Sequence, residues 1–224
     1  MTGVLLAVAG CGPAGGHAQP EVPASPGSSS QAAATADPAV PRGFVVVGDS
    51  ITAGSTTTTE SMVGDQVRGD ASWVPAAEEA SGWDLVAGWA VPGATTAQMR
   101  SGVAAGEWPA DLLVVMAGTN DLVQGRPWEE SAADLEGLVA AVGAPTVVVV
   151  AIAPNDPRPA VRNGYNAALA HLAGEEGWTY LDPWVEVDAG GAFAPGASGD
   201  GTHPTAAVAA DVGSRIGRSL AALG

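Results

Sequence analysis

The chain has 224 residues, of which 46% are hydrophobic and 14% charged, a balance that favours a globular domain and excludes a disordered chain. Its 24 acidic and 8 basic residues give a formal net charge of −16, so no basic surface exists for DNA or RNA, and an acidic membrane surface is disfavoured. The single cysteine, Cys11, excludes an intrachain disulfide and a zinc site built on several cysteines.

The N-terminal segment, residues 1–11, has the pattern of a secretory signal. A short apolar run ends in small residues before Cys11, and it is too short to span a bilayer as a helix. The sequence Val8-Ala9-Gly10-Cys11 resembles the bacterial lipobox, in which the cysteine is lipidated after cleavage, although no Lys or Arg precedes the run. We expect an extracytoplasmic protein, secreted or anchored by a lipid on Cys11. The alternative is a frayed apolar tail.

Residues 12–42 are rich in Pro, Ser, Ala and Gly, a composition that buries little surface and is typical of a semi-flexible tether. A lipid at Cys11 and this tether would hold a catalytic domain away from a membrane surface. His17 lies in the tether, so we expect no catalytic role for it. The folded domain is predicted to span residues 43–224, which is long enough for one hydrophobic core.

Strand and helix patterns alternate through the predicted domain. Apolar, β-branched runs typical of buried strands occupy residues 44–47, 112–116 and 147–152, and shorter candidates occupy 84–86 and 178–181. Helical spacing predicts helices over residues 72–80, 96–105, 135–142, 161–172 and 208–220. This alternation predicts a parallel sheet covered by helices on both faces, with the ligand site at the carboxyl ends of the strands.

Ser50 follows the first predicted strand directly, in the sequence Gly48-Asp49-Ser50. A serine hydroxyl is a poor nucleophile until a base takes its proton, and the start of a following helix offers N–H groups to a developing oxyanion. Taken alone, the tripeptide is equally typical of an ordinary turn between a strand and a loop.

The sequence Asp200-Gly201-Thr202-His203-Pro204 precedes the last predicted helix. A catalytic serine needs an imidazole, and the imidazole needs a carboxylate that holds its tautomer, which Asp200 and His203 can supply from one tight turn. Pro204 restricts His203 to an extended backbone and so fixes the direction of its ring. The alternative is a loop histidine beside a helix-capping aspartate.

Two further polar positions follow predicted strands. Gly93 in a loop offers an unobstructed backbone N–H, and Asn120 in Gly118-Thr119-Asn120-Asp121 offers a side-chain amide, both suited to an oxyanion. The alternative for each is turn chemistry, which Gly and Asn favour in any case.

Together these four blocks resemble those of the SGNH, or GDSL-like, hydrolases, which carry Ser, Gly, Asn and His in this order. The blocks are Gly48-Asp49-Ser50-Ile51, Val91-Pro92-Gly93-Ala94-Thr95-Thr96, Gly118-Thr119-Asn120-Asp121-Leu122 and Asp200-Gly201-Thr202-His203-Pro204. The resemblance implies that Ser50 is the nucleophile, His203 the general base and Asp200 the residue that orients His203. It also implies an oxyanion hole made by the N–H groups of Ser50 and Gly93 and the amide of Asn120.

The resemblance implies a flavodoxin-like, three-layer α/β/α sandwich with a mostly parallel five-stranded sheet. It further implies a serine esterase without metal or organic cofactor, acting on a small-molecule, glycan or lipid ester. The compact domain, with no long lid, favours a shallow site and short acyl chains. One departure is Ile51 where the family often has Leu, a swap that keeps volume and polarity. The α/β-hydrolase motif G-x-S-x-G fits less well, because Thr52 stands where its second glycine belongs.

Several points stay open. Trp184 and Phe193 flank a Gly-rich loop before Asp200, so we expect them to wall the substrate pocket, although most of the seven tryptophans are expected in the core. Two other functions remain: acyl transfer to a glycan hydroxyl, and an inactive surface module that binds glycans.

We expect a monomer. We also expect no metal site, because no residues besides Asp200 and His203 have the spacing of metal ligands.

Overall fold

The computed structural model describes residues 42–55, 62–63 and 67–223. The predicted signal segment and nearly all of the predicted tether lie outside these residues, as do Cys11 and His17. Their roles therefore stay predictions. Within the described part of the chain, no helix is long and apolar enough to cross a membrane.

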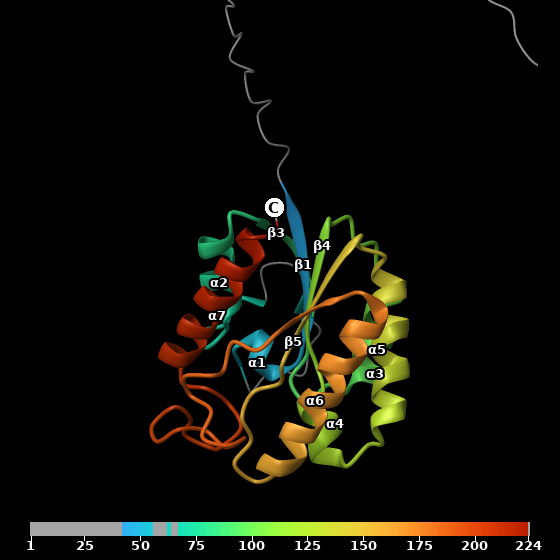
Figure 1. Cartoon of the computed structure of the whole chain (residues 1–224). Helices are drawn as coiled ribbons and strands as arrows, with labels where there is room; N and C mark the ends of the chain where they lie inside the picture. Colours follow the sequence, from blue (N-terminus) through green and yellow to red (C-terminus); the bar gives the residue numbers. More distant parts are fainter. Residues whose placement is uncertain (1–41, 56–61, 64–66, 224) are drawn as a thin grey trace, which may run out of the picture. The chain divides into compact units, whose positions relative to one another are not determined.

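Five parallel strands form the centre of the domain, which confirms the predicted sheet (Figure 1). Their order across the sheet is β3-β1-β4-β5-β6, and the two-residue β2 adds an antiparallel edge beside β3, which the sequence did not predict. The bounds are β1 Gly43–Gly48, β2 Met62–Val63, β3 Asp84–Ala90, β4 Leu112–Met116, β5 Thr146–Val150 and β6 Thr179–Leu181.

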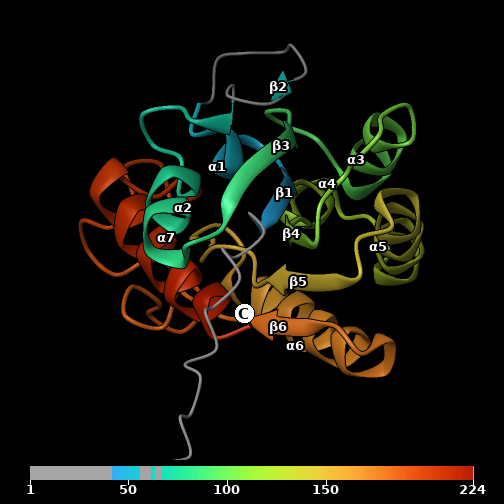
Figure 2. The same cartoon turned by 90° about the horizontal axis from the view of Figure 1, so that it is seen from above.

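Helices cover both faces of the sheet, as the alternating sequence pattern predicts (Figures 1 and 2). On one face lie α1 (Ser50–Ala53), α2 (Val74–Ser81) and α7 (Ala206–Ala221), and on the other lie α3 (Thr96–Val103), α4 (Thr119–Gln124), α5 (Trp128–Val142) and α6 (Pro159–Glu176). β1 shows why: Phe44 and Val46 pack into the first layer, whereas Val45 and Val47 pack into the second. Successive side chains of this fully buried strand point to opposite faces of the sheet, so they belong to two separate hydrophobic cores.

The predicted elements are all present, with shifted bounds. β3 continues four residues beyond the predicted 84–86, and the helix predicted from residue 72 begins at Val74. Val161, expected on the buried stripe of α6, is instead 53% exposed, because the buried face of the helix runs through Arg162, Tyr165 and Leu169 and leaves Val161 outside it. The short helix α4 was not among the predicted helices.

Candidate active site

Ser50 is the first residue of α1 and lies directly beyond the carboxyl end of β1. Asp49 caps this helix, because its side chain accepts a hydrogen bond from the backbone N–H of Ile51 at 3.0 Å. Glycine is required at position 48 for close approach: a Cβ there would stand 2.1 Å from Oγ1 of Thr52. The strand therefore passes into α1 without a loop, and Ser50 is held at the sheet's rim.

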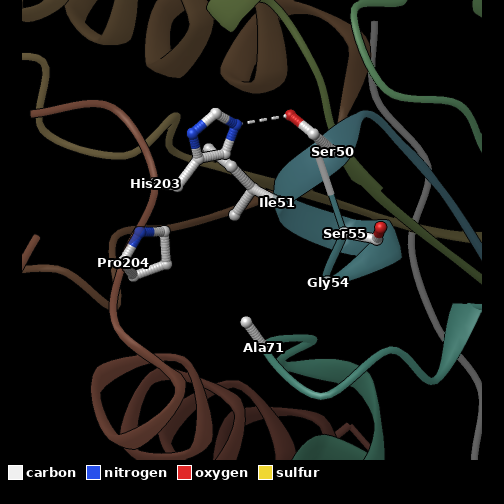
Figure 3. A pocket seen from close by; sticks show the side chains of 7 residues that line it. All are labelled: Ser50, Ile51, Gly54, Ser55, Ala71, His203 and Pro204. Carbon is white, nitrogen blue, oxygen red and sulfur yellow. Dashed lines mark hydrogen bonds between the residues drawn. The ribbon is translucent and has the colours of Figure 1, made fainter. Parts of the chain in front are cut away.

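His203 reaches Ser50 from a segment 153 positions further along the chain. Its Nε2 lies 2.8 Å from the Ser50 Oγ (Figure 3). Its Nδ1 lies 2.7 Å from Oδ2 of Asp200. A carboxylate only accepts hydrogen bonds, so Nδ1 carries the proton and Nε2 is free to accept the serine hydroxyl proton. The structure thus brings the three residues into one hydrogen-bonded chain.

Asp200 is held as a carboxylate by its own turn. Its Oδ1 accepts hydrogen bonds from the backbone N–H groups of Thr202 at 2.9 Å and His203 at 2.8 Å. Partial burial opposes ionisation, but these bonds and the one from the His203 ring outweigh it and hold the pKa of Asp200 well below its usual range. The carboxylate therefore stays charged through the neutral range, although its side chain is 55% exposed.

Asn120 and Gly93 lie on the same rim, from the next two strands. Asn120 is the second residue of α4, and its Nδ2 donates to the Ala94 carbonyl at 3.0 Å and to Oδ2 of Asp49 at 3.3 Å. Gly93 sits in the turn after β3 with φ +81°, and no described residue accepts a hydrogen bond from its N–H. The bond from Asn120 to Ala94 joins the two segments that carry the predicted oxyanion donors.

Asp121 fixes α4 in place, a role that the sequence motif did not reveal. Its fully buried carboxylate accepts from the Thr96 N–H at 2.9 Å, the Thr96 hydroxyl at 2.7 Å and the Ser131 hydroxyl at 3.1 Å, and it pairs with Arg126 at 2.5 Å. Thr96 begins α3 directly after the Gly93 turn, so this one carboxylate ties the Gly93 and Asn120 segments together. A satisfied buried network of this kind is rigid.

Asp49 stands out electrostatically. Burial raises the pKa of its carboxyl to about 6, although the hydrogen bond from Ile51 and the nearby His203 oppose the increase. It touches Asn120 and immediately precedes Ser50, so its charge is felt by both. The sequence indicated only that Asp49 shapes the serine turn.

A pocket of about 270 Å³ opens beside the Ser50–His203 pair (Figure 3). It is lined by Ser50, His203, Ile51, Gly54, Ser55, Ala71 and Pro204. Ala71 was not predicted, because an alanine before a helix carries no local signal of function. Its place in the wall follows only from the tertiary fold.

Trp184 and Phe193, expected to wall the pocket, do not line it, and that prediction is wrong. Trp184 is fully buried, its indole N–H donates to the Ala151 carbonyl at 2.8 Å, and it meets Phe193 edge to face at 6.3 Å between ring centroids. Both rings fill the core under the Gly-rich loop, because a loop without secondary structure needs large side chains to hold it on the sheet.

The histidine on α6 lies apart from this site. His171 is exposed on α6, 3.8 Å from Glu175, and it does not line the pocket beside Ser50. Among the described residues, no group of three or more His, Cys, Asp or Glu side chains is placed to hold a metal ion.

A strand-to-helix turn carrying a serine, with a histidine and a carboxylate from a later segment on one rim, is the arrangement of a serine hydrolase built on a parallel α/β sheet. The model of the GDSL-like Lipase/Acylhydrolase family matches residues 46–210, and the chain belongs to this family. Its class is therefore that of an ester hydrolase. A search of curated proteins returns no match.

Solved structures share the fold at low identity. A member of the lipolytic protein G-D-S-L family from Veillonella parvula is 18% identical with a TM-score of 0.61, and the match covers 78% of this chain and 95% of that one. A carbohydrate esterase family 3 protein from Talaromyces cellulolyticus is 19% identical with a TM-score of 0.57, covering 81% and 97%. An acetyl esterase mutant is 17% identical with a TM-score of 0.58, covering 81% and 97%.

Proposed function

We propose that the protein hydrolyses carboxylic esters through Ser50, His203 and Asp200. The observation that carries this proposal is the hydrogen-bonded chain from the Ser50 hydroxyl through the His203 ring to Asp200, with distances of 2.8 and 2.7 Å. Ser50 Oγ attacks the ester carbonyl while Nε2 of His203 takes its proton. The same proton then passes to the leaving alcohol, and water repeats the sequence on the acyl-enzyme to release the acid.

The oxyanion is proposed to bind the N–H groups of Ser50 and Gly93 and the amide of Asn120. Ser50 opens a helix, so its N–H has no partner inside that helix. Asn120 has both amide hydrogens engaged, and the bond to Asp49 is the longer at 3.3 Å. We propose that the oxyanion replaces this longer contact, while the bond to Ala94 keeps the amide aimed. Each donor contributes about 3 kcal/mol in the transition state.

The substrate is proposed to be a small ester with a short acyl chain. The pocket beside Ser50 has a volume of about 270 Å³, below the roughly 300–1,000 Å³ of sites that enclose drug-sized ligands. It therefore cannot enclose both the acyl chain and the alcohol of a large ester, so one of the two must lie outside it along the rim, and we propose that this part is a short acyl chain. Turnover of acyl esters of graded chain length tests this, and a rate that rises steadily to long chains would contradict it.

The decisive variant is Ser50→Ala. It should abolish turnover of phenyl acetate while leaving the melting temperature near that of the parent, because it removes only one hydroxyl at a partly exposed position. Ser101→Ala, on an exposed face of α3, is the matched control and should keep full activity. Retained turnover in Ser50→Ala would refute the assignment.

An inactive glycan-binding module is the main rival, and a covalent probe separates the two. A fluorophosphonate should label the parent protein at Ser50, because phosphonylation needs the same activated hydroxyl and oxyanion hole. Labelling should disappear in Ser50→Ala and drop strongly in His203→Ala. A protein that binds glycans but does not label would support the binding module.

We also propose that the domain is a monomer and acts outside the cytoplasm. The lipobox-like sequence Val8-Ala9-Gly10-Cys11 supports the location outside the cytoplasm. A lipid on Cys11 would then hold the domain at a membrane surface through residues 12–42. In a bacterial host, metabolic labelling with palmitate should mark the parent and spare Cys11→Ser. Equal labelling of both would exclude this anchor.

A further inference from the structure

Among the described residues, the lining of the pocket beside Ser50 lies on one side of the reacting pair. Its lining includes His203 and Pro204, but neither of the proposed oxyanion donors from the other strands, Gly93 and Asn120. The close-up shows the cavity between the His203–Pro204 segment and the end of α1, with Ala71 at its far wall (Figure 3). The two sides of the nucleophile thus differ in shape.

The chemistry assigns different parts of the substrate to these two sides. In the tetrahedral intermediate the former carbonyl carbon carries Ser50 Oγ, the oxyanion, the acyl chain and the leaving oxygen. When the bond to the leaving oxygen breaks, the proton on Nε2 of His203 moves to that oxygen, so the alcohol part must lie against the imidazole. The oxyanion lies against Gly93 and Asn120, away from the pocket.

We propose that this pocket is the binding site for the alcohol part of the ester, and that it takes a small uncharged alcohol. The inference rests on the proposed function and adds the class of leaving group. Its volume of about 270 Å³ is below the roughly 300–1,000 Å³ of sites that enclose drug-sized ligands, which favours a small alcohol. No lining residue that the structure describes carries a fixed charge, and Ile51, Ala71 and Pro204 give the pocket apolar walls.

Ala71 sets the depth of this alcohol pocket. Its methyl group points into the cavity in Figure 3. The segment that carries it is clamped to α1: Ala71 N–H donates to the Gly54 carbonyl at 3.3 Å, and the Ser72 hydroxyl donates to the Thr52 carbonyl at 2.7 Å. A Cβ at Gly54 would stand 2.2 Å from the Ser72 nitrogen, so the two segments cannot approach further or slide. A larger side chain at position 71 must therefore project into the pocket.

The test compares Ala71→Leu with the parent on two ester series. In the first, acetate is fixed and the alcohol grows from methanol to butanol to hexanol; in the second, methanol is fixed and the acid grows from acetate to butyrate to hexanoate. Ala71→Leu should lower kcat/KM about tenfold or more for butyl and hexyl acetate and less than about twofold for methyl acetate. Its dependence on acyl length should match that of the parent.

Two further variants keep the result interpretable. Ala71→Val should show the same selectivity to a smaller degree, and it stands in if the leucine variant melts early. Ala105→Leu makes the same exchange at an exposed position near Trp108, in a separate pocket, and should leave both series unchanged.

Partitioning of the acyl-enzyme gives an independent readout. By microscopic reversibility an acceptor alcohol enters the same pocket, so added butanol should divert acetyl groups from water to butyl acetate in the parent and less so in Ala71→Leu. Diversion to methanol should be equal in both. If Ala71→Leu instead shortens the acyl chains accepted and spares the alcohol series, the pocket holds the acyl part and the inference is overturned. If the parent protein shows neither ester turnover nor labelling by the fluorophosphonate, the proposed function itself is wrong.

Discussion

Asp200 positions His203 from an exposed turn, so its contribution can be separated from that of the serine. Asp200→Asn keeps the shape of the side chain, but its amide can donate a hydrogen bond to Nδ1 of His203. This favours the tautomer with the proton on Nε2, which cannot accept the proton of Ser50. We expect kcat to fall about 10²- to 10⁴-fold with KM little changed. Steady-state kinetics on phenyl acetate measure this effect.

The double variant supplies the control for that interpretation. Because Asp200 acts through His203, Asp200→Asn should add almost nothing in a His203→Ala background. Multiplicative losses in the two variants would show that Asp200 acts by another route.

Asp49 should impose a pH dependence on stability. Burial raises the pKa of Asp49 from 3.8 to about 6. The folded state therefore holds the proton more tightly than the unfolded state. The resulting stabilisation is fully present below pH 3.8 and is lost as pH rises through about 6. Ionised Asp49 then costs the folded state about 3 kcal/mol at pH 7. The Asp49→Asn variant has no carboxyl to ionise at this position. The free energy of unfolding of the variant, minus that of the parent, should therefore increase from pH 4 to pH 7. Urea unfolding at both pH values measures the gain.

A matched variant guards against a general effect of removing negative charge. Asp211→Asn lies at an exposed position on α7 and should leave the difference between pH 4 and pH 7 as in the parent. An equal gain in both variants would mean that the net charge of −16, and not the burial of Asp49, sets the dependence.

At this scale the sequence was informative where chemistry is local. The Asp200–His203 pair is set by a turn of four residues, so its geometry could be expected from spacing and from Pro204. Trp184 could not be placed in this way, because a tryptophan beside a Gly-rich loop suits a pocket wall and a core equally well. Only the position of the Ala151 carbonyl, which accepts the Trp184 indole N–H, decides between the two.

Helices α2 and α7 show an element held by glycine packing. A Cβ at Gly213 of α7 would stand 2.1 Å from the Trp73 carbonyl oxygen at the start of α2. Gly213→Ala should therefore destabilise the protein by about 1–3 kcal/mol, although alanine favours helices over glycine. In contrast, Gly174→Ala on α6 meets no atom within 4 Å and should stabilise by up to about 1 kcal/mol. Thermal unfolding of both variants checks the opposite signs, and a stabilised Gly213→Ala would refute the packing argument.

The same packing explains where element prediction fell short. The sequence predicted this strand only over residues 84–86, and glycine, which stands at position 88, weakens a strand interior. In the fold, a Cβ at Gly88 would stand 2.7 Å from Val67 and 2.9 Å from Val46, so the glycine is there for a close approach and the strand runs on to Ala90. Such approaches join residues distant in sequence, and periodicity carries no information on them.

At the scale of the whole molecule, the parallel sheet turns four separate motifs into one site. Because parallel strands end on the same edge, residues that follow β1, β3 and β4 were predictable neighbours. The contact between residues 200–204 and Ser50 depends on how α7 packs on α2. The amphipathic stripe of α7 predicts that this helix is packed on one face, but it does not predict the direction in which the helix lies. The fold class therefore followed from pattern alone, whereas the depth and side of the pocket required the tertiary structure.

The net charge of −16 should also bias which esters reach the site. A protein with this excess of carboxylates surrounds itself with a negative potential that lowers the local concentration of anionic substrates. We expect phenyl hydrogen succinate, an anion at pH 7, to show a lower kcat/KM than its neutral counterpart phenyl methyl succinate. The gap should narrow as salt is raised, since the Debye length shrinks from about 30 Å at 0.01 M to about 8 Å at 0.15 M. Release of phenol from both esters over this salt range measures it, and a ratio that stays constant would show that local contacts at the rim, and not the field of the whole molecule, discriminate between them.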